Sequence, residues 1–500
     1  MQRLSGLDAM FLYMETPTNH MHVTGVFLLD PSAAPEGFSF GQVRDMVGRR
    51  LHRAPPFRRR LVEVPLRLAH PLWIEDPDFD LDYHVRRACL PSPGGQGELE
   101  SFVGQMIGLP LDRKRPLWEM YLVEGLEGGR QAIVMKMHHA AIDGVSGAEL
   151  TAAWLDLEAG PPPDADEDSW RAERVPNEID LLFGAWTQLA ASPVRAVRAA
   201  RRVLETALHV SEHNRDSGVM PPPSPFSAPK TSFNQSITPH RRVAFCEVPL
   251  DDLKAVKNHF GCTVNDVVLT LCASALRRYL LAEGGLPEEP LVGFVPMSVR
   301  ADDEKLSAGN RVSAMLTSLA TDVADPVERL RTISAGMTDA KSQESRIGAD
   351  VLTDWTEFTF PALIGRAARL ISSMRVFDRV RPAFNVTISN IPGPPFPLFL
   401  AGARMVGMYP LGPVVEGAGL NITVMSYCGI VYFGLSGCRE TVPDLAELPE
   451  MITESLDELL ALVRPRSRAE TPPGGNRASG PAGHAALVER GRGALLEAPG

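Results

Sequence analysis

Two proline-rich segments constrain the fold of this chain most, because neither can continue as a long helix or strand. They lie at residues 160–170 (GPPPDADEDSW) and 217–230 (SGVMPPPSPFSAPK), and such composition is typical of surface linkers. Between them, residues 177–213 are expected to be helical, with a break near Pro193. The whole connection from 161 to 240 is much longer than an ordinary loop. We therefore expect it to join two separate halves of the chain.

The two predicted halves, 1–160 and 241–463, both mix strands with helices, so the expected fold class is α/β with mixed sheets. In the first half, alternating and buried apolar runs predict strands at His22–Leu29 and Gln131–His138, and Phe40–Arg53 is expected to be a helix. In the second half we expect a helix from Thr263, two strands within Gly419–Gly437, a closing helix at Pro449–Val463, and strands at RVAFCEVPL from about Arg241, Pro290–Met297 and Phe384–Ser389. Residues 464–500 are poor in bulky apolar side chains and are expected to be disordered.

Composition excludes several classes of function. The 500 residues are 44% hydrophobic, which is enough for a large core. With 50 Lys and Arg against 61 Asp and Glu, the net charge is −11. A nucleic-acid-binding protein needs a basic face that releases counterions, so an acidic chain without a basic tract is a poor candidate.

Cysteine spacing and apolar runs point to a cytoplasmic protein. The six cysteines form no C-x-x-C pair, and we expect free thiols at Cys89, Cys246, Cys262, Cys272, Cys428 and Cys438. No secretory signal is visible at the start. The stretches 382–403 and 417–438 are uncharged, but prolines interrupt the first, and the second alternates like paired strands. Neither is expected to be a transmembrane helix.

The motif with the clearest chemical meaning is MHHAAIDG at residues 137–144, between a predicted strand and a helix expected from Ser146 to Leu157. Adjacent side chains on an extended backbone point to opposite faces, so His138 and His139 cannot share one task. One histidine can face a cleft while the other packs inside. Asp143 and Gly144 are residues typical of a turn.

A neutral imidazole in such a cleft suits general-base catalysis, in which it takes a proton from an attacking hydroxyl. A purely structural histidine pair remains the alternative. A metal site is not expected, because one inward histidine and one aspartate supply too few ligands. A serine hydrolase is disfavoured, because no G-x-S-x-G sequence is present.

The motif resembles the H-H-x-x-x-D-G signature of the acyltransferase superfamily that includes chloramphenicol acetyltransferase and peptide-synthetase condensation domains. Within it, the chain is similar to the bacterial wax ester synthase/acyl-CoA:diacylglycerol acyltransferase family from about residue 3 to 463, apart from the connection between the halves. The other motifs that carry the resemblance are Leu4–Asp8 with Phe11-Leu12, Met21–Val23, Phe79–Asp82 with His84-Val85, Pro116–Trp118, Asn265-Asp266, Pro296–Arg300 and Ser389–Pro394.

The resemblance implies two chloramphenicol acetyltransferase-like subdomains with the active site in a channel between them. His139 would be the general base that lets an acceptor alcohol attack the acyl-CoA thioester directly, without an acyl-enzyme. Asp143, with Gly144, would support the loop through an arginine, for which Arg300 and Arg242 are candidates. On the opposite-face argument His138 is structural.

Further candidate residues follow from the other motifs, each with a structural alternative. Asn265 is a candidate oxyanion donor, and Asp266 beside it is favoured at a helix start in any case. The run of Pro116, Leu117 and Trp118 either lines a substrate pocket or anchors a strand. The segment that begins with Ser389 and Asn390 either forms a channel wall or is only a fixed turn.

The implied partners are long-chain acyl-CoA as co-substrate and diacylglycerol or a fatty alcohol as acceptor, with no bound cofactor or metal. The products would be triacylglycerol or wax esters. Because these lipids reside in membranes, we expect peripheral association with the inner face of the membrane or with lipid droplets. Residues 178–210, with apolar residues along one side and arginines along the other, either lie on that surface or pack across the halves.

Two alternatives to this function stay open. One is acyl transfer to another hydroxyl or from a carrier protein, and the other is a non-catalytic lipid-droplet or lipid-shuttling protein. The sequence does not distinguish diacylglycerol from a fatty alcohol, because both present one hydroxyl on an apolar body.

Overall fold

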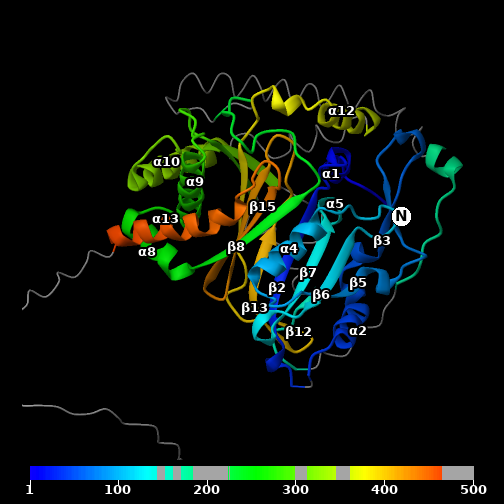
Figure 1. Cartoon of the computed structure of the whole chain (residues 1–500). Helices are drawn as coiled ribbons and strands as arrows, with labels where there is room; N and C mark the ends of the chain where they lie inside the picture. Colours follow the sequence, from blue (N-terminus) through cyan, green and yellow to red (C-terminus); the bar gives the residue numbers. More distant parts are fainter. Residues whose placement is uncertain are drawn as a thin grey trace, which may run out of the picture. The chain divides into compact units, whose positions relative to one another are not determined.

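Two six-stranded sheets organise the protein, and their strand order departs from the expected division of the chain (Figure 1). The first sheet has the order β12-β13-β2-β7-β6-β5. Its strands are β2 (His22–Asp30), β5 (Val85–Cys89), β6 (Trp118–Glu124), β7 (Gln131–His138), β12 (Phe399–Leu400) and β13 (Ala403–Leu411). The 399–411 hairpin therefore belongs to the sheet of the N-terminal half, although its sequence lies in the C-terminal half.

The second sheet has the order β10-β9-β11-β14-β15-β8 and is also mixed. Its strands are β8 (Arg241–Pro249), β9 (Val292–Ser298), β10 (Val312–Ser318), β11 (Val386–Ile391), β14 (Leu420–Tyr427) and β15 (Ile430–Cys438). Strand β11 runs parallel to both of its neighbours, β9 and β14, whereas the other pairs are antiparallel. This confirms the expected mixed α/β fold class.

The computed structural model describes residues 1–35, 37–142, 153–160, 170–183, 223, 226–298, 312–344 and 361–463. Contacts divide the chain into one unit at 1–463 and a second at 464–500, and the second lies outside the described residues. Residues 146–152 of the helix expected from Ser146 to Leu157 also lie outside them; Ala153 and Trp154 are helical, but the helix ends there and not at Leu157, because Asp156 pairs with Phe399. Most of the segment 178–210 lies outside the described residues as well, although residues 178–183 are helical.

The described helices include those expected at Phe40–Arg53, from Thr263 and at Pro449–Val463. In the first half they are α1 (Gly6–Met14), α2 (Phe40–Arg50), α3 (Leu81–His84), α4 (Gln96–Ile107) and α5 (His139–Ile142). In the second half they are α8 (Leu250–Phe260), α9 (Val264–Ala282), α10 (Pro326–Glu344), α12 (Pro361–Ser373) and α13 (Leu448–Val463). A small third sheet joins β1 (Gln2–Arg3), β4 (Leu72–Glu75) and β3 (Arg59–Val62).

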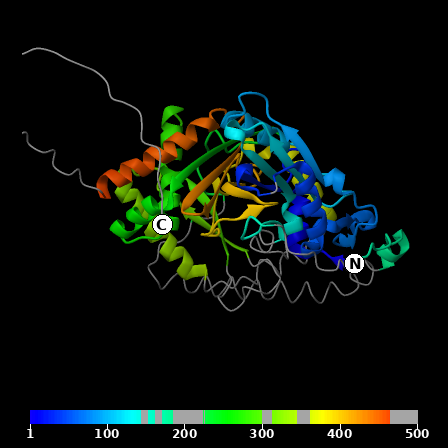
Figure 2. The ribbon, with the colours of Figure 1, turned by 90° about the horizontal axis from the view of Figure 1, so that it is seen from below.

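The cores follow the sheets. Helices α8, α9, α10 and α13 gather at the second sheet, where the apolar side chains of α9 are largely buried (Figures 1 and 2). The apolar core on the first sheet also includes residues from the C-terminal half, among them Phe245 of β8 and Met405 of β13. Where the sheets meet, Gly434 of β15 lies against the backbone of Pro410 in β13, and a Cβ there would come within 1.8 Å of the Pro410 carbonyl oxygen. Only glycine permits this approach.

Within the described residues, no single helix has the length and apolarity needed to cross a membrane. The pair α8 and α9 meets that criterion only when the two helices are combined, and a 102° bend separates them.

Candidate active site

The H-H-x-x-x-D-G motif begins where β7 ends and α5 starts, and its two histidines face different surroundings. The backbone N–H of His139 donates to the carbonyl of Met21 (2.9 Å), and its half-buried ring stacks on Phe11 of α1 with centroids 4.0 Å apart. His138 is 1% exposed, and its Nδ1 accepts a hydrogen bond from the N–H of Ala140 (3.1 Å). Because Nδ1 accepts, the proton of the neutral His138 ring lies on Nε2.

The Nε2 atom of His138 faces a half-buried carboxylate. Oε2 of Glu15, just after α1, lies 3.6 Å from this nitrogen, and Arg113 donates to the same oxygen through Nε (2.9 Å). Burial alone would raise the pKa of Glu15, but the hydrogen bond from His138 and the charge of Arg113 lower it. Burial also lowers the pKa of His138. A neutral His138 thus links an ionised Glu15 to the first turn of α5, two positions that are far apart in the chain.

The Pro116–Trp118 run lies behind the motif. The carbonyl of Leu117 accepts from the N–H of His138 (3.0 Å), and Leu117 packs in the small core that includes Ala140. Trp118 is 1% exposed, donates from Nε1 to the carbonyl of Phe57 (2.8 Å), and stacks on His84. These contacts match the strand-anchor interpretation, and the pocket-lining role stays a prediction.

The side chains of Asn265 and Asn390, from two of the predicted motifs, contact each other beside the second sheet. Asn390, near the end of β11, donates from Nδ2 to Oδ1 of Asn265 in the first turn of α9 (3.3 Å), and both side chains are half-buried. Neighbouring Ser389 is half-buried as well. Asp266 completes a capping box with Thr263 and accepts from the hydroxyl of Ser334 (2.9 Å). Its contacts are those of a helix cap, whereas Asn265 and Asn390 present half-buried amides.

Several predicted residues lie outside the described part of the chain. They are Asp143, Gly144 and Arg300, so the expected support of the loop by an arginine stays a prediction. The other candidate, Arg242, is exposed and donates to the carbonyl of Pro443 (2.7 Å).

Sequence reasoning missed the buried charges behind β7. Lys136 is 1% exposed, and its ammonium lies 3.2 Å from Glu119 and donates to the carbonyls of Met106 and Leu109. The signal was present for Lys136, because a lysine within a buried strand requires a partner. No comparable pattern marked Glu15 or Arg113, which contact the motif only through the tertiary fold.

The described residues contain no group of three or more histidine, cysteine, aspartate or glutamate side chains arranged to hold a metal. All six cysteines are free thiols, as expected. Burial raises the pKa of Cys272 to about 12, which makes that thiol a poor nucleophile at neutral pH.

Family models match both parts of the chain. The model of the wax ester synthase/diacylglycerol acyltransferase catalytic domain matches residues 4–268, and that of the WS/DGAT C-terminal domain matches residues 308–460.

Individual relatives and structures agree with these models. A Mycobacterium tuberculosis (strain CDC 1551 / Oshkosh) protein whose name places it among the diacylglycerol O-acyltransferases is 40% identical over 92% of this chain and 90% of its own length. The solved wax ester synthase/diacylglycerol acyltransferase of Marinobacter aquaeolei VT8 is 33% identical, with a TM-score of 0.67 over 93% of this chain and 100% of that one. The first condensation domain of the calcium-dependent antibiotic synthetase shares the fold, with a TM-score of 0.52 at 15% identity over 93% of this chain and 96% of that one. The chain therefore belongs to the wax ester synthase/diacylglycerol acyltransferase family.

Proposed function

We propose that this protein is an acyl-CoA-dependent O-acyltransferase that esterifies diacylglycerol to triacylglycerol and also accepts long-chain alcohols to give wax esters. The observation that carries the proposal is the placement of His139. Its half-buried ring lies at the start of α5, stacked on Phe11, while a buried His138 holds the backbone behind it. The buried histidine supports the turn, and we assign the chemistry to the half-buried one. Family membership supplies the substrate class.

In the proposed reaction, the imidazole of His139 accepts the hydroxyl proton of the acceptor while its oxygen attacks the thioester carbonyl of acyl-CoA. The tetrahedral intermediate then collapses, the C–S bond breaks, and the CoA thiolate takes the proton from His139. No acyl-enzyme forms. His139 alone therefore carries out both proton transfers, from the acceptor hydroxyl and to the CoA thiolate.

The other motif residues have supporting roles in this proposal. Asn265, joined to Asn390, is the candidate donor to the oxyanion, and Ser389 borders the same region. Asp143 and Gly144 keep their predicted supporting role in this proposal, and the carbonyl of Leu117 holds the N–H of His138 from behind. Acyl-CoA is a co-substrate rather than a resident cofactor.

We further propose that the enzyme works in the cytoplasm, attached peripherally to the inner face of the membrane or to lipid droplets. Diacylglycerol and long acyl chains partition into such surfaces, so the acceptor must be taken from them.

The test is ester synthesis by the purified full-length protein with palmitoyl-CoA and either diacylglycerol or hexadecanol, with release of free CoA measured in parallel. His139→Ala should lower kcat about 10³-fold, because positioned general bases contribute roughly 10²–10⁴-fold. The control His259→Ala changes an exposed histidine of α8 and should keep full activity. Full ester formation by His139→Ala would contradict the mechanism. Lipid binding without CoA release would point to a non-catalytic protein, and preference for an acyl carrier protein would point to a different donor.

A further inference from the structure

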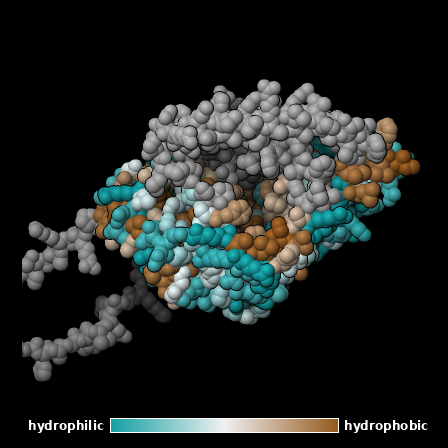
Figure 3. Space-filling model, turned by 90° about the horizontal axis from the view of Figure 1, so that it is seen from above, coloured by the Kyte–Doolittle hydropathy of each residue, from teal (hydrophilic) through white to brown (hydrophobic). Residues whose placement is uncertain are grey.

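A cavity of about 870 Å³ opens beside α12, and its wall carries an unusual concentration of arginine for an acidic chain. The arginines are Arg366 and Arg369 of α12 and Arg375 just after it. Apolar surface is contributed by Pro17, Ile237 and Leu370. Helices α12, α1 and α5 lie at the same end of the molecule (Figure 1), and Figure 3, which looks onto that end, shows hydrophobic and hydrophilic side chains side by side.

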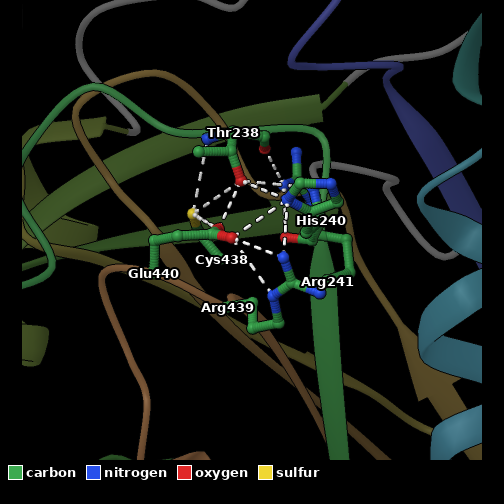
Figure 4. A network of polar contacts seen from close by, with 6 residues as sticks. All are labelled: Thr238, His240, Arg241, Cys438, Arg439 and Glu440. Atoms are coloured by element: carbon green, nitrogen blue, oxygen red, sulfur yellow. Dashed lines mark hydrogen bonds and ion pairs between the residues drawn. The ribbon is translucent and has the colours of Figure 1, made fainter.

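Two of the four charged groups in the cavity wall, Glu440 and Arg375, already have partners. Glu440 accepts from Thr238, pairs with His240 (2.9 Å) and contacts Arg439 (2.9 Å), in the network drawn in Figure 4. Burial would raise the pKa of Glu440, but these hydrogen bonds lower it to about 2, so the carboxylate stays ionised and satisfied. Arg375 is paired with Asp378 (2.6 Å).

Arg366 and Arg369 differ from these groups. Both are exposed, they are three residues apart on α12 and so share a face, and within the described residues neither guanidinium is assigned an ion pair or hydrogen bond. Two unpaired guanidinium groups beside apolar surface suit a ligand that carries phosphate groups and an aromatic base. The cavity is within the size range of small-molecule sites.

The cavity also lies next to the segment from Thr18 to Met21, which contacts the backbone of His139. The hydroxyls of Thr18 and Ser372 both donate to Oε1 of Glu416 (2.6 Å each), which joins α12 to the residues before β2. Thr18 lines the cavity, and Met21, whose carbonyl holds the N–H of His139, follows three residues later. Because Thr18 and Met21 are three positions apart, the distance between them along the chain is at most about 11 Å. An extended pantetheine arm is longer than that distance.

We propose that this cavity binds the adenosine 3′,5′-bisphosphate end of acyl-CoA, with Arg366 and Arg369 on its phosphates and the adenine against the apolar wall. The inference rests on the proposed use of acyl-CoA by this chain. It assigns the co-substrate to the side of the molecule that carries α12, so that the pantetheine arm runs past Thr18 toward His139.

The experiment compares Arg366→Ala, Arg369→Ala and the double variant with wild type, using the full-length protein. Binding of adenosine 3′,5′-bisphosphate and of CoA is measured by calorimetry, and KM is measured separately for palmitoyl-CoA and diacylglycerol. Each substitution should raise the Kd for both nucleotides and the KM for palmitoyl-CoA about 10-fold, as expected for one charge-assisted hydrogen bond. The KM for diacylglycerol should change less than about 2-fold, because the acceptor is uncharged. Lysine substitutions should restore part of the affinity.

Arg331→Ala, an exposed arginine of α10 outside the cavity, is the matched control and should leave every constant unchanged. Unchanged CoA binding in the double variant would overturn the proposal. So would a loss confined to binding of phosphatidylglycerol-containing vesicles, because the arginines would then meet a lipid headgroup. If the wild type binds CoA through these arginines but forms no ester, the proposed function fails and the site assignment stands.

Discussion

The back of β7 and the junction of β8 with β15 both place a histidine beside a glutamate, yet the two sites work under opposite physical conditions. Behind β7, His138 and Glu15 are enclosed, and burial lowers the pKa of His138. At the junction, His240 and Glu440 are exposed, and Glu440 lies in the wall of the cavity. Buried groups must be satisfied by fixed partners, whereas water can replace a partner at the junction. We therefore expect substitutions behind β7 to cost far more than substitutions at the junction.

The largest effect should follow from Glu119→Gln, which removes the charge opposite Lys136. The ammonium of Lys136 would remain buried with only carbonyl partners, and breaking a buried pair on one side typically costs about 3–5 kcal/mol of unfolding free energy. Chemical denaturation at pH 7 measures the loss.

Two further variants test this interpretation. Glu119→Gln combined with Lys136→Met should recover much of the stability. Glu454→Gln, which breaks an exposed pair with Arg278, should cost less than about 1 kcal/mol. Equal losses for the buried and the exposed pair would contradict the comparison.

The next effect is a pH dependence caused by His84. This ring is fully buried and stacked on Trp118, its Nδ1 donates to the Trp118 carbonyl, and burial lowers its pKa from 6.5 to about 4. Between these two values the unfolded chain binds a proton that the folded chain does not. Stability from this group is therefore complete above about pH 6.5 and declines by roughly 3 kcal/mol as the pH falls to 4.

Denaturation curves at several pH values between 7 and 4 measure this decline. His84→Phe keeps a stacking ring, and its stability should fall less steeply over the same interval. The prediction fails if the variant and the wild type show the same slope.

A smaller effect, on catalysis, is expected for Glu15→Ala. Without this carboxylate the ring of His138 loses its partner, and the start of α5 can shift His139. A misplacement of about 1 Å can cost roughly 10²-fold in rate, so kcat should fall by about that factor. Ester synthesis and KM for both substrates are measured together.

Glu15→Gln offers a neutral acceptor to His138 and should recover part of the activity. Glu63→Ala removes a carboxylate that also contacts Arg113 but not His138, and should leave kcat nearly unchanged. If Glu15→Gln is as inactive as Glu15→Ala, the negative charge is required rather than the hydrogen-bond geometry.

The smallest effect should come from Glu440→Gln at the junction. Because Glu440 is partly exposed, solvent screening limits its contribution, and we expect less than about 1 kcal/mol at pH 7. Its lowered pKa implies a contribution that is complete above the usual carboxylate range and lost only as the pH falls toward 2. Thermal unfolding at pH 7 and pH 3 measures both statements, and a loss of several kcal/mol at pH 7 would contradict them.

The sequence predicted local elements well, because their signals are local. The strand Gln131–His138 has the predicted bounds, and the hairpin around Cys428 and Gly429 forms from β14 and β15. The capping box of Thr263 and Asp266 begins α9 as expected. His138 and His139 face different surroundings, but strand geometry is not the reason, because β7 ends at His138 and His139 is the first residue of α5.

The assignment of β13 to the first sheet could not be predicted in this way. No strand was predicted at Ala403–Leu411, and the choice of its partner between β2 and the strands of the second half depends on long-range packing, including the glycine contact at Pro410. The partners of His138 are equally remote, since Glu15 and Arg113 lie in other elements.

The sequence by itself determined the mixed α/β class, the capped helices and the family motif, because periodicity, capping and motif spacing act over a few residues. The tertiary structure alone decided that Glu15 lies beside His138, that Leu117 and Trp118 support the motif from behind, and that Arg366 and Arg369 meet Thr18 around one cavity. These contacts join residues that are tens to hundreds of positions apart. Only the packing of whole elements against one another brings such residues together.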